Sequence, residues 1–214
     1  MDWRYDGPMS KRYDCYCPLA HALGMVGERW SLLISLELMR GPKRYTDLVE
    51  GLPGIGTNIL AARLRDLEAA GIVERRILPP PAPAKVYELT EYGRGLKPVI
   101  RELALWGARS LGPPGEEVEL FPGWLVNVLD TVLGPIAPRG RFEFRVGDEI
   151  ASLVDGEAQA GSIEEPDVLI EGDPVAIHEM FVDGRFDRAT ITGDRSLLER
   201  LVDAAPEPVA LPSS

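Results

Sequence analysis

The stretch GLPGIGTNILAARLRDLEAAGIVERRILPPPAPAKVYELTEYGRGL, residues 51–96, decides the fold of this chain. Leu60, Leu64 and Leu67 recur in it at the i, i+4, i+7 spacing that places side chains on one face of a helix. Two short strand patterns follow, joined by the proline-rich tip PPPAPA. A helix followed by such a hairpin predicts a winged helix, although an ordinary corner of one helix and two strands fits the same pattern.

The ends of these elements are marked by residues with special backbone preferences. Gly56 or Thr57 can cap the helix at its start, and Gly71 supplies the left-handed residue that ends it. The strands are expected at Ile72–Leu78 and Lys85–Leu89. The helix therefore keeps one face on a core and leaves the opposite face free.

The free face carries hydrogen-bond donors and small side chains, a mixture that lets a helix enter a DNA major groove. Basic residues before the helix and on the hairpin are placed to reach phosphates, although a solvated surface explains them equally well. The residues predicted to contact DNA are Lys43, Arg44, Thr57, Asn58, Ala61, Ala62, Arg63, Arg65, Arg75, Arg76 and Lys85.

The residues before this stretch complete a helical domain. Pro18 to Met39 repeats apolar residues at helical spacing, and Gly27 is expected to break it into two helices. Trp30 is interpreted as a core residue rather than a platform for base stacking. Arg44 to Glu50 is expected to form a short helix that precedes the recognition helix.

Several motifs occur in a characteristic order: Cys-Pro, Gly-x-Arg-Trp, Gly-Pro-x-Arg-Tyr, Leu-Pro-Gly-Ile and Leu-Arg-x-Leu-Glu. With these motifs, Met9 to Arg76 and the following KVYELTEYGRGLKPVIRELALWG resemble the HxlR family of bacterial winged helix-turn-helix transcription regulators. The resemblance covers roughly the first half of the chain. It implies double-stranded DNA as a partner.

One departure from the family pattern concerns base recognition. Family members often place Ser, Thr or Gln where this chain has Gly56, Ala61 and Ala62. Alanine can touch a thymine methyl group but cannot hydrogen-bond a base edge. Direct recognition is therefore expected to depend on Asn58, Arg63 and DNA shape.

Glu91 to Leu111 is expected to form one long helix with more apolar surface than a small domain needs. In the family this helix and the N-terminal one form a homodimer. The resemblance therefore implies two recognition helices about one DNA turn apart, roughly 34 Å, on a pseudo-palindromic operator.

Charge divides the 214-residue chain into two parts. Its formal net charge is −11, but residues 1–112 carry 16 Lys and Arg against 13 Asp and Glu, so the acidic excess lies in the rest. A Pro- and Gly-rich linker is predicted at 113–118, a second domain at 119–205 and a loose tail at 206–214. No signal peptide or membrane span is evident, so a cytoplasmic protein is expected.

The second half alternates helical and strand patterns. Phe121 to Leu133 has an apolar helical stripe, and strands are expected at Arg141–Val146, Glu149–Val154, Asp167–Glu171 and Arg185–Thr192. Helices are expected after an Asp173 cap, up to Phe181, and from Arg195 to Val202. The fold class of the chain is α+β, with an antiparallel sheet and helices in the second half.

Within this half, residues 166–202 resemble the closing part of a sterol carrier protein 2 domain, through a strand, a capped helix, Asp-Gly and Ile-Thr-Gly-Asp before the last helix. Such domains enclose an apolar tunnel for hydrophobic molecules. The alternative is that the apolar residues simply fill a core. The residues that could line a tunnel are Trp124, Leu125, Leu129, Phe142, Phe144, Met180, Phe181 and Phe186.

Cys15 and Cys17 are too close in sequence for an ordinary structural disulfide, and His21 does not complete a zinc site with them. Cys17 precedes a predicted helix, where the helix dipole can activate a thiol. Some family members switch by oxidising an N-terminal cysteine. Two inert thiols are the alternative.

These features favour a regulator, and specifically a repressor, that binds DNA as a homodimer and senses a hydrophobic small molecule. A redox regulator switched through Cys17 is the alternative. An enzyme is disfavoured because no nucleophile elbow, zinc helix or dinucleotide motif is present, and neither His21 nor His178 has an evident catalytic partner. No cofactor or metal is expected.

Overall fold

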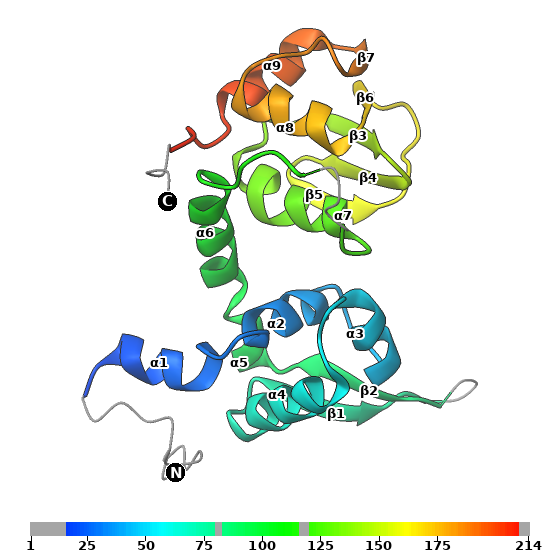
Figure 1. Ribbon diagram of the computed structural model, residues 1–214. Coiled ribbons are helices and arrows are strands. Elements are labelled where there is room, and N and C mark those ends of the chain that lie inside the picture. The colour runs from blue at the N-terminus through cyan, green and yellow to red at the C-terminus, as the bar shows by residue number, and fades with distance from the viewer. Residues whose placement is uncertain (1–15, 80–82, 116–119, 210–214) are drawn as a thin grey trace. The chain divides into compact units, whose positions relative to one another are not determined.

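The computed structural model describes residues 16–79, 83–115 and 120–209 (Figure 1). The chain divides into two compact units on either side of the Ile100–Arg101 bond. Each unit has its own buried apolar core. Among the described residues, no helix is long and apolar enough to cross a membrane.

The first unit is a set of helices with a two-stranded hairpin (Figure 1). Helix α6 begins in this unit and continues past the division between the units. In chain order the elements are α1 (Pro18–Val26), α2 (Ser31–Met39), α3 (Tyr45–Gly51), α4 (Thr57–Ala69), β1 (Val73–Ile77), β2 (Lys85–Leu89), α5 (Glu91–Arg94) and α6 (Lys97–Ala108).

The core of this unit confirms the leucine pattern of the recognition helix. Leu60, Leu64 and Leu67 of α4 are 0% exposed and lie in one apolar cluster with residues of α2 and α3. Gly56 is the N-cap, and its carbonyl accepts the backbone N–H groups of Ile59 and Leu60 at 2.9 Å each. The helix ends before Gly71, whose φ of +69° confirms the predicted left-handed residue.

The hairpin of β1 and β2, called the wing below, is antiparallel and pairs Val73 with Leu89. Lys43 extends it by an isolated bridge to Tyr87, in which the Lys43 N–H donates to the Tyr87 carbonyl at 3.0 Å. The Tyr87 N–H donates back to the Lys43 carbonyl at 2.8 Å. This short third strand leads directly into α3 and attaches the wing to the helices.

The prediction of one helix over Glu91–Leu111 is wrong, because α5 and α6 are separate helices. Gly95 is the C-cap of α5, and glycine is a weak helix former. Pro98 has no N–H to donate to the carbonyl four residues earlier, where its ring would also clash. Proline is tolerated only in the first turn, so a new helix starts at Lys97.

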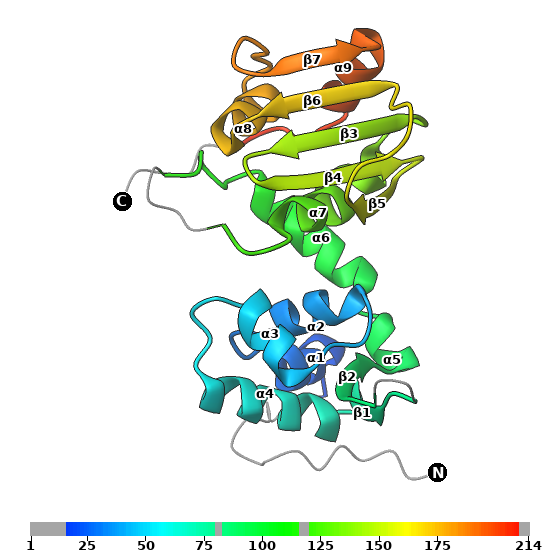
Figure 2. The same cartoon turned by 90° about the vertical axis from the view of Figure 1, so that its right-hand side faces the viewer.

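The second unit consists of a five-stranded sheet with helices on one face (Figure 2). The strand order is β5-β4-β3-β6-β7. In chain order the elements are α7 (Trp124–Val128), the π-helix η2 (Leu129–Leu133), the 3₁₀-helix η3 (Gly134–Ile136), β3 (Arg141–Val146), β4 (Glu149–Val154), β5 (Glu157–Ala160), β6 (Val168–Gly172), α8 (Pro174–Val182), β7 (Thr190–Gly193) and α9 (Arg195–Asp203).

Several predicted boundaries in this unit are confirmed and others are wrong. Strands β3 and β4 occupy the predicted residues, and the Asp173 carboxylate caps α8 by accepting the Ala176 N–H at 2.7 Å. This backbone hydrogen bond, and then the Arg188 guanidinium, lower the pKa of Asp173. The strand predicted at Arg185–Thr192 is shorter, because Arg185 and Arg188 form ion pairs with Glu179 and hold a loop there.

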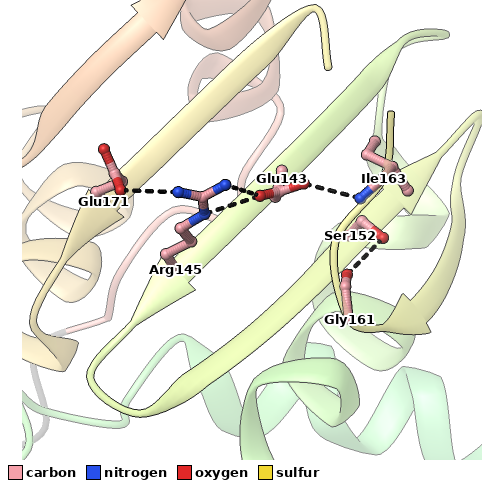
Figure 3. Close-up of polar contacts among 6 residues, drawn as sticks. All are labelled: Glu143, Arg145, Ser152, Gly161, Ile163 and Glu171. Atoms are coloured by element: carbon pink, nitrogen blue, oxygen red, sulfur yellow. Dashed lines mark hydrogen bonds and ion pairs between the residues drawn. The ribbon is translucent and has the colours of Figure 1, made fainter. Parts of the chain in front are cut away.

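The prediction of an antiparallel sheet is also wrong. Strand β3 runs antiparallel to β4 but parallel to β6, with Phe144 opposite Ile170, so the sheet is mixed. Parallel neighbours need a crossover connection, and here β4, β5 and residues 161–167 together lead from β3 to β6. Hydrogen bonds hold this segment on the face of the sheet opposite the apolar core, and it returns the chain from β5 to the side of β3 (Figure 3).

Two buried polar side chains hold the crossover segment (Figure 3). Glu143 is 1% exposed and accepts the Ile163 N–H at 2.8 Å, while Ser152 is 0% exposed and donates to the Gly161 carbonyl at 3.1 Å. The second oxygen of Glu143 binds the Arg145 guanidinium at 2.7 Å and raises the pKa of that arginine. The alternation of β3 predicts an outward Glu143 but does not reveal that a loop covers it.

Replacing Glu143 with alanine should lower the free energy of unfolding by about 2 to 3 kcal/mol, because it leaves a buried N–H and a guanidinium without their acceptor. The matched control is Glu171→Ala, which removes a more exposed carboxylate bound to the same Arg145 and should cost less than about 1 kcal/mol. Urea denaturation, with hydrogen exchange at the Ile163 amide, measures both. Equal losses for the two variants would contradict the proposed role of Glu143.

Candidate nucleic-acid interface

The exposed face of α4 lies opposite its buried leucines. Asn58, Ala62 and Arg65 follow one another at i, i+4 and i+7, so they share the face that points away from the core. Asn58 and Arg65 are exposed, while Ala61 and Ala62 are half-buried. This surface, called the reading face below, therefore presents an amide and a guanidinium beside small apolar groups, as predicted from the sequence.

The start of α4 is held by the preceding helix. The Tyr45 hydroxyl of α3 donates to the Thr57 carbonyl at 2.7 Å. Thr57 itself is exposed at the first position of α4, so it lies next to the free N–H groups of the first turn. The sequence pattern does not predict this contact, because a hydroxyl partner twelve residues away leaves no periodic signal.

Arg63 lies on the flank of α4 rather than on the reading face. Its guanidinium lies 2.9 Å from the Asp66 carboxylate and 3.4 Å from that of Glu28, and its side chain is only 15% exposed. Glu28 belongs to the loop between α1 and α2. Arg63 therefore connects this loop to α4, and its placement does not put it beside Asn58 as a second base-reading group.

The cations predicted to meet phosphate fall into two groups. Lys43, Arg75 and Arg76 form ion pairs with Glu37, Glu68 and Glu88, at 3.0, 2.8 and 3.0 Å respectively. Three other exposed cations of this predicted set form no ion pair in the part of the chain that the structure describes. They are Arg44, Arg65 and Lys85.

Arg44 and Arg65 lie at the two helices of the helix-turn-helix, and Lys85 begins the second strand of the wing. Free cations at these places can approach a phosphate without first breaking an ion pair. Together with Asn58 they are the chemical groups with which this surface can bind a nucleic acid.

The sequence that forms α3, α4 and the wing matches a known family. The model of the HxlR-like helix-turn-helix family matches residues 25–114. The HTH-type transcriptional regulator YodB of Bacillus subtilis is 41% identical over 103 residues, which make up 48% of this chain and 91% of that protein. This chain belongs to the HxlR family.

Other relatives show the same extent of similarity. An uncharacterized HTH-type transcriptional regulator of Synechocystis, sll1512, is 36% identical over 107 residues, or 50% of this chain and 79% of that protein. Among solved structures, the reduced form of YodB from B. subtilis is 38% identical, covers 47% of this chain and all of that chain, and has a TM-score of 0.41. The redox regulator HypR in its oxidized form is 33% identical, covers 45% of this chain and 99% of that chain, and has a TM-score of 0.41.

The HxlR match is thus a match to about the first half of the chain. The chain is a helix-turn-helix transcriptional regulator in that half, while the matched region ends before α7 of the second unit.

In the second unit, the residues predicted to line a tunnel belong to one apolar core of sheet and helices or pack against it. Leu125, Leu129, Phe142, Phe144 and Met180 are buried in one core, and Trp124, Phe181 and Phe186 are half-buried against it.

The cysteine prediction can be followed only in part, because Cys15 lies outside the described residues. Cys17 is an exposed free thiol at the N-cap of α1, and its carbonyl accepts the His21 N–H at 2.9 Å. Within residues 16–79, 83–115 and 120–209, no group of three or more His, Cys, Asp or Glu could hold a metal ion.

Arg63 and Arg65 provide a matched test of this surface within one helix. Arg65→Gln should weaken DNA binding and reduce the slope of log K against log salt concentration by about 1, because it removes one free phosphate-facing cation. Arg63→Gln should change the slope less, because two carboxylates already offset its charge. Fluorescence anisotropy between about 50 and 200 mM salt measures both; a larger loss of slope for Arg63→Gln would refute the assignment.

Proposed function

We propose that this protein is a one-component transcriptional repressor that binds a pseudo-palindromic operator as a homodimer and releases it in response to a hydrophobic small molecule. The observation that carries the proposal is the exposed α4 face with Asn58 and Arg65, together with the exposed cations Arg44 and Lys85, which form no ion pair. Asn58 would read a base edge, and Ala61 and Ala62 would contact thymine methyl groups.

Dimerisation is supported by apolar side chains that are exposed on α1, α2 and α6. Leu19 and Leu23 lie one turn apart on α1, and Leu33 of α2 is exposed as well. On α6, Val99, Leu103 and Trp106 form a further exposed stripe at helical spacing. A second copy would cover these faces and place two α4 helices about one DNA turn, roughly 34 Å, apart.

The role of the second unit as the sensor rests on its resemblance to a sterol carrier domain and on its bulky apolar core between sheet and helices. The Phe144 and Phe181 rings lie 6.5 Å apart in this layer, an aromatic contact that a bound apolar ligand would have to open. A coupling of about 1 to 3 kcal/mol between effector and operator would change operator affinity roughly 5- to 150-fold.

The first test is fluorescence anisotropy on the duplex upstream of the protein's own gene, against scrambled DNA. We expect preferential binding that falls roughly 10³- to 10⁵-fold between about 50 and 200 mM salt, as for a dimer that touches about 6 to 10 phosphates. Asn58→Ala should lose preference between the duplexes more than it loses total affinity. Equal affinity of wild type and Asn58→Ala for every duplex would reject α4 as the base-reading helix.

A second candidate switch is oxidation of Cys17, which the exposure of its thiol at the start of α1 favours. Peroxide would oxidise the thiolate to a sulfenic acid, which condenses with a second thiol to form a disulfide and water. In this case the second unit would brace the dimer.

If Cys17 is the switch, peroxide should change the operator affinity of the wild type and leave Cys17→Ser unchanged, with the response of the wild type reversed by a thiol reductant. Anisotropy before and after treatment measures this. A response of the same size in both proteins would eliminate Cys17 as the sensor.

A further inference from the structure

One arginine of the wing is engaged by both neighbouring elements. The Arg75 guanidinium makes two parallel contacts with the Glu68 carboxylate at the end of α4, Nε to Oε1 at 2.8 Å and Nη2 to Oε2 at 2.8 Å. The same guanidinium lies over the ring of Tyr87 on the neighbouring strand, 5.3 Å from the ring centroid. Paired contacts of this kind fix a direction as well as a distance.

Arg75 belongs to a row that crosses the wing. It is the direct partner of Tyr87 in the β1–β2 ladder, and Tyr87 is the bridge partner of Lys43. Directly opposite residues project to the same face of a sheet, so the side chains of Lys43, Tyr87 and Arg75 share one face. Each end of the row is bound to a helix, Arg75 to Glu68 of α4 and Lys43 to Glu37 of α2.

We propose that Arg75 is a positioning residue that fixes the angle of the wing to the recognition helix, instead of a phosphate contact. Its guanidinium contacts both Glu68 and Tyr87, so Arg75 fixes the orientation of the strands relative to α4. Glu68 then contributes to DNA binding although its charge repels DNA. This inference rests on the proposed binding of DNA by α4 and the wing.

Charge removal distinguishes positioning from simple electrostatics. Glu68→Gln removes a negative charge near the predicted DNA surface, so electrostatics alone would strengthen binding. If Glu68 positions the wing through Arg75, the same change should weaken binding about two- to fivefold, the loss expected from one exposed ion pair. Glu74→Gln is the matched control, because Glu74 is an exposed carboxylate on the same strand as Arg75 and should leave affinity unchanged or tighter.

The conservative variant Arg75→Lys also distinguishes a positioning role from a phosphate contact. Lysine keeps the positive charge of Arg75 but cannot form the forked contact with Glu68 or stack as a plane on Tyr87. A positioning role therefore predicts that Arg75→Lys and Arg75→Gln lose affinity to the same extent. A phosphate contact predicts that Arg75→Lys resembles wild type and that only Arg75→Gln lowers the salt slope.

The experiment uses the full chain and a duplex that the wild type selects from a random-sequence pool. Affinity and hydroxyl-radical footprints are measured for wild type, Glu68→Gln, Glu74→Gln, Arg75→Lys and Arg75→Gln, with melting curves to confirm folding. We expect Glu68→Gln and both Arg75 variants to lose protection at the flanks that the wing contacts, while the central protection from α4 remains. Binding by Glu68→Gln as tight as by Glu74→Gln, with wild-type footprints, would overturn the proposal.

Hydrogen exchange in the absence of DNA separates this proposal from the proposed function. The amides of β1 and β2 should exchange faster in Glu68→Gln and Arg75→Lys than in Glu74→Gln. A wild type that selects no sequence would reject operator binding, whereas exchange rates equal to those of the control would reject the positioning role of Arg75.

Discussion

The buried stripe of Leu60, Leu64 and Leu67 is the constraint on which the DNA-binding half depends. Because these side chains are completely enclosed, α4 can adopt only one rotation about its own axis, and this rotation places Asn58 and Arg65 on the outside. A rotation of one residue, about 100°, would bury polar groups and expose leucine. The chemistry of the exposed face is therefore a consequence of apolar packing on the other side.

Carboxylates determine what the basic residues of this unit can do. Most of the charged residues predicted to contact DNA form ion pairs with Glu or Asp. The geometry of these ion pairs differs. Arg75 has a forked pair and an aromatic partner, while Arg76 shares one nitrogen between the two oxygens of the buried Glu88, at 3.0 and 3.3 Å. Pairing with a carboxylate reduces the long-range attraction of these cations to DNA, and it fixes the shape of the wing. Arg44, Arg65 and Lys85, which form no ion pair, remain for attraction.

Local periodicity predicted the elements well because each is specified by residues within one or two turns. The leucines of α4, the Asp173 cap and the boundaries of β3 were all accessible in this way. Contacts between residues far apart in sequence could not be predicted from local periodicity. Alternation places Glu143 outside the core, yet a segment twenty residues later covers it, and this crossover makes β3 and β6 parallel. Periodicity identifies the face of a residue but not what covers that face.

The same limit explains why the site was predicted as a set of residues but not as a set of roles. Composition marks Arg63, Arg65 and Arg75 equally as cations near a recognition helix. The structure separates them through their neighbours. Arg63 lies beside Glu28 and Asp66, and Arg75 lies beside Glu68 and Tyr87. The exposed Arg65 forms no ion pair, and its Nε donates to the Ala61 carbonyl of its own helix at 3.2 Å. Since the first 112 residues carry only a small excess of positive charge, few cations are available for general attraction. We therefore expect selective binding to depend on the base contact proposed for Asn58 and on the shape in which the paired cations hold the wing and α4.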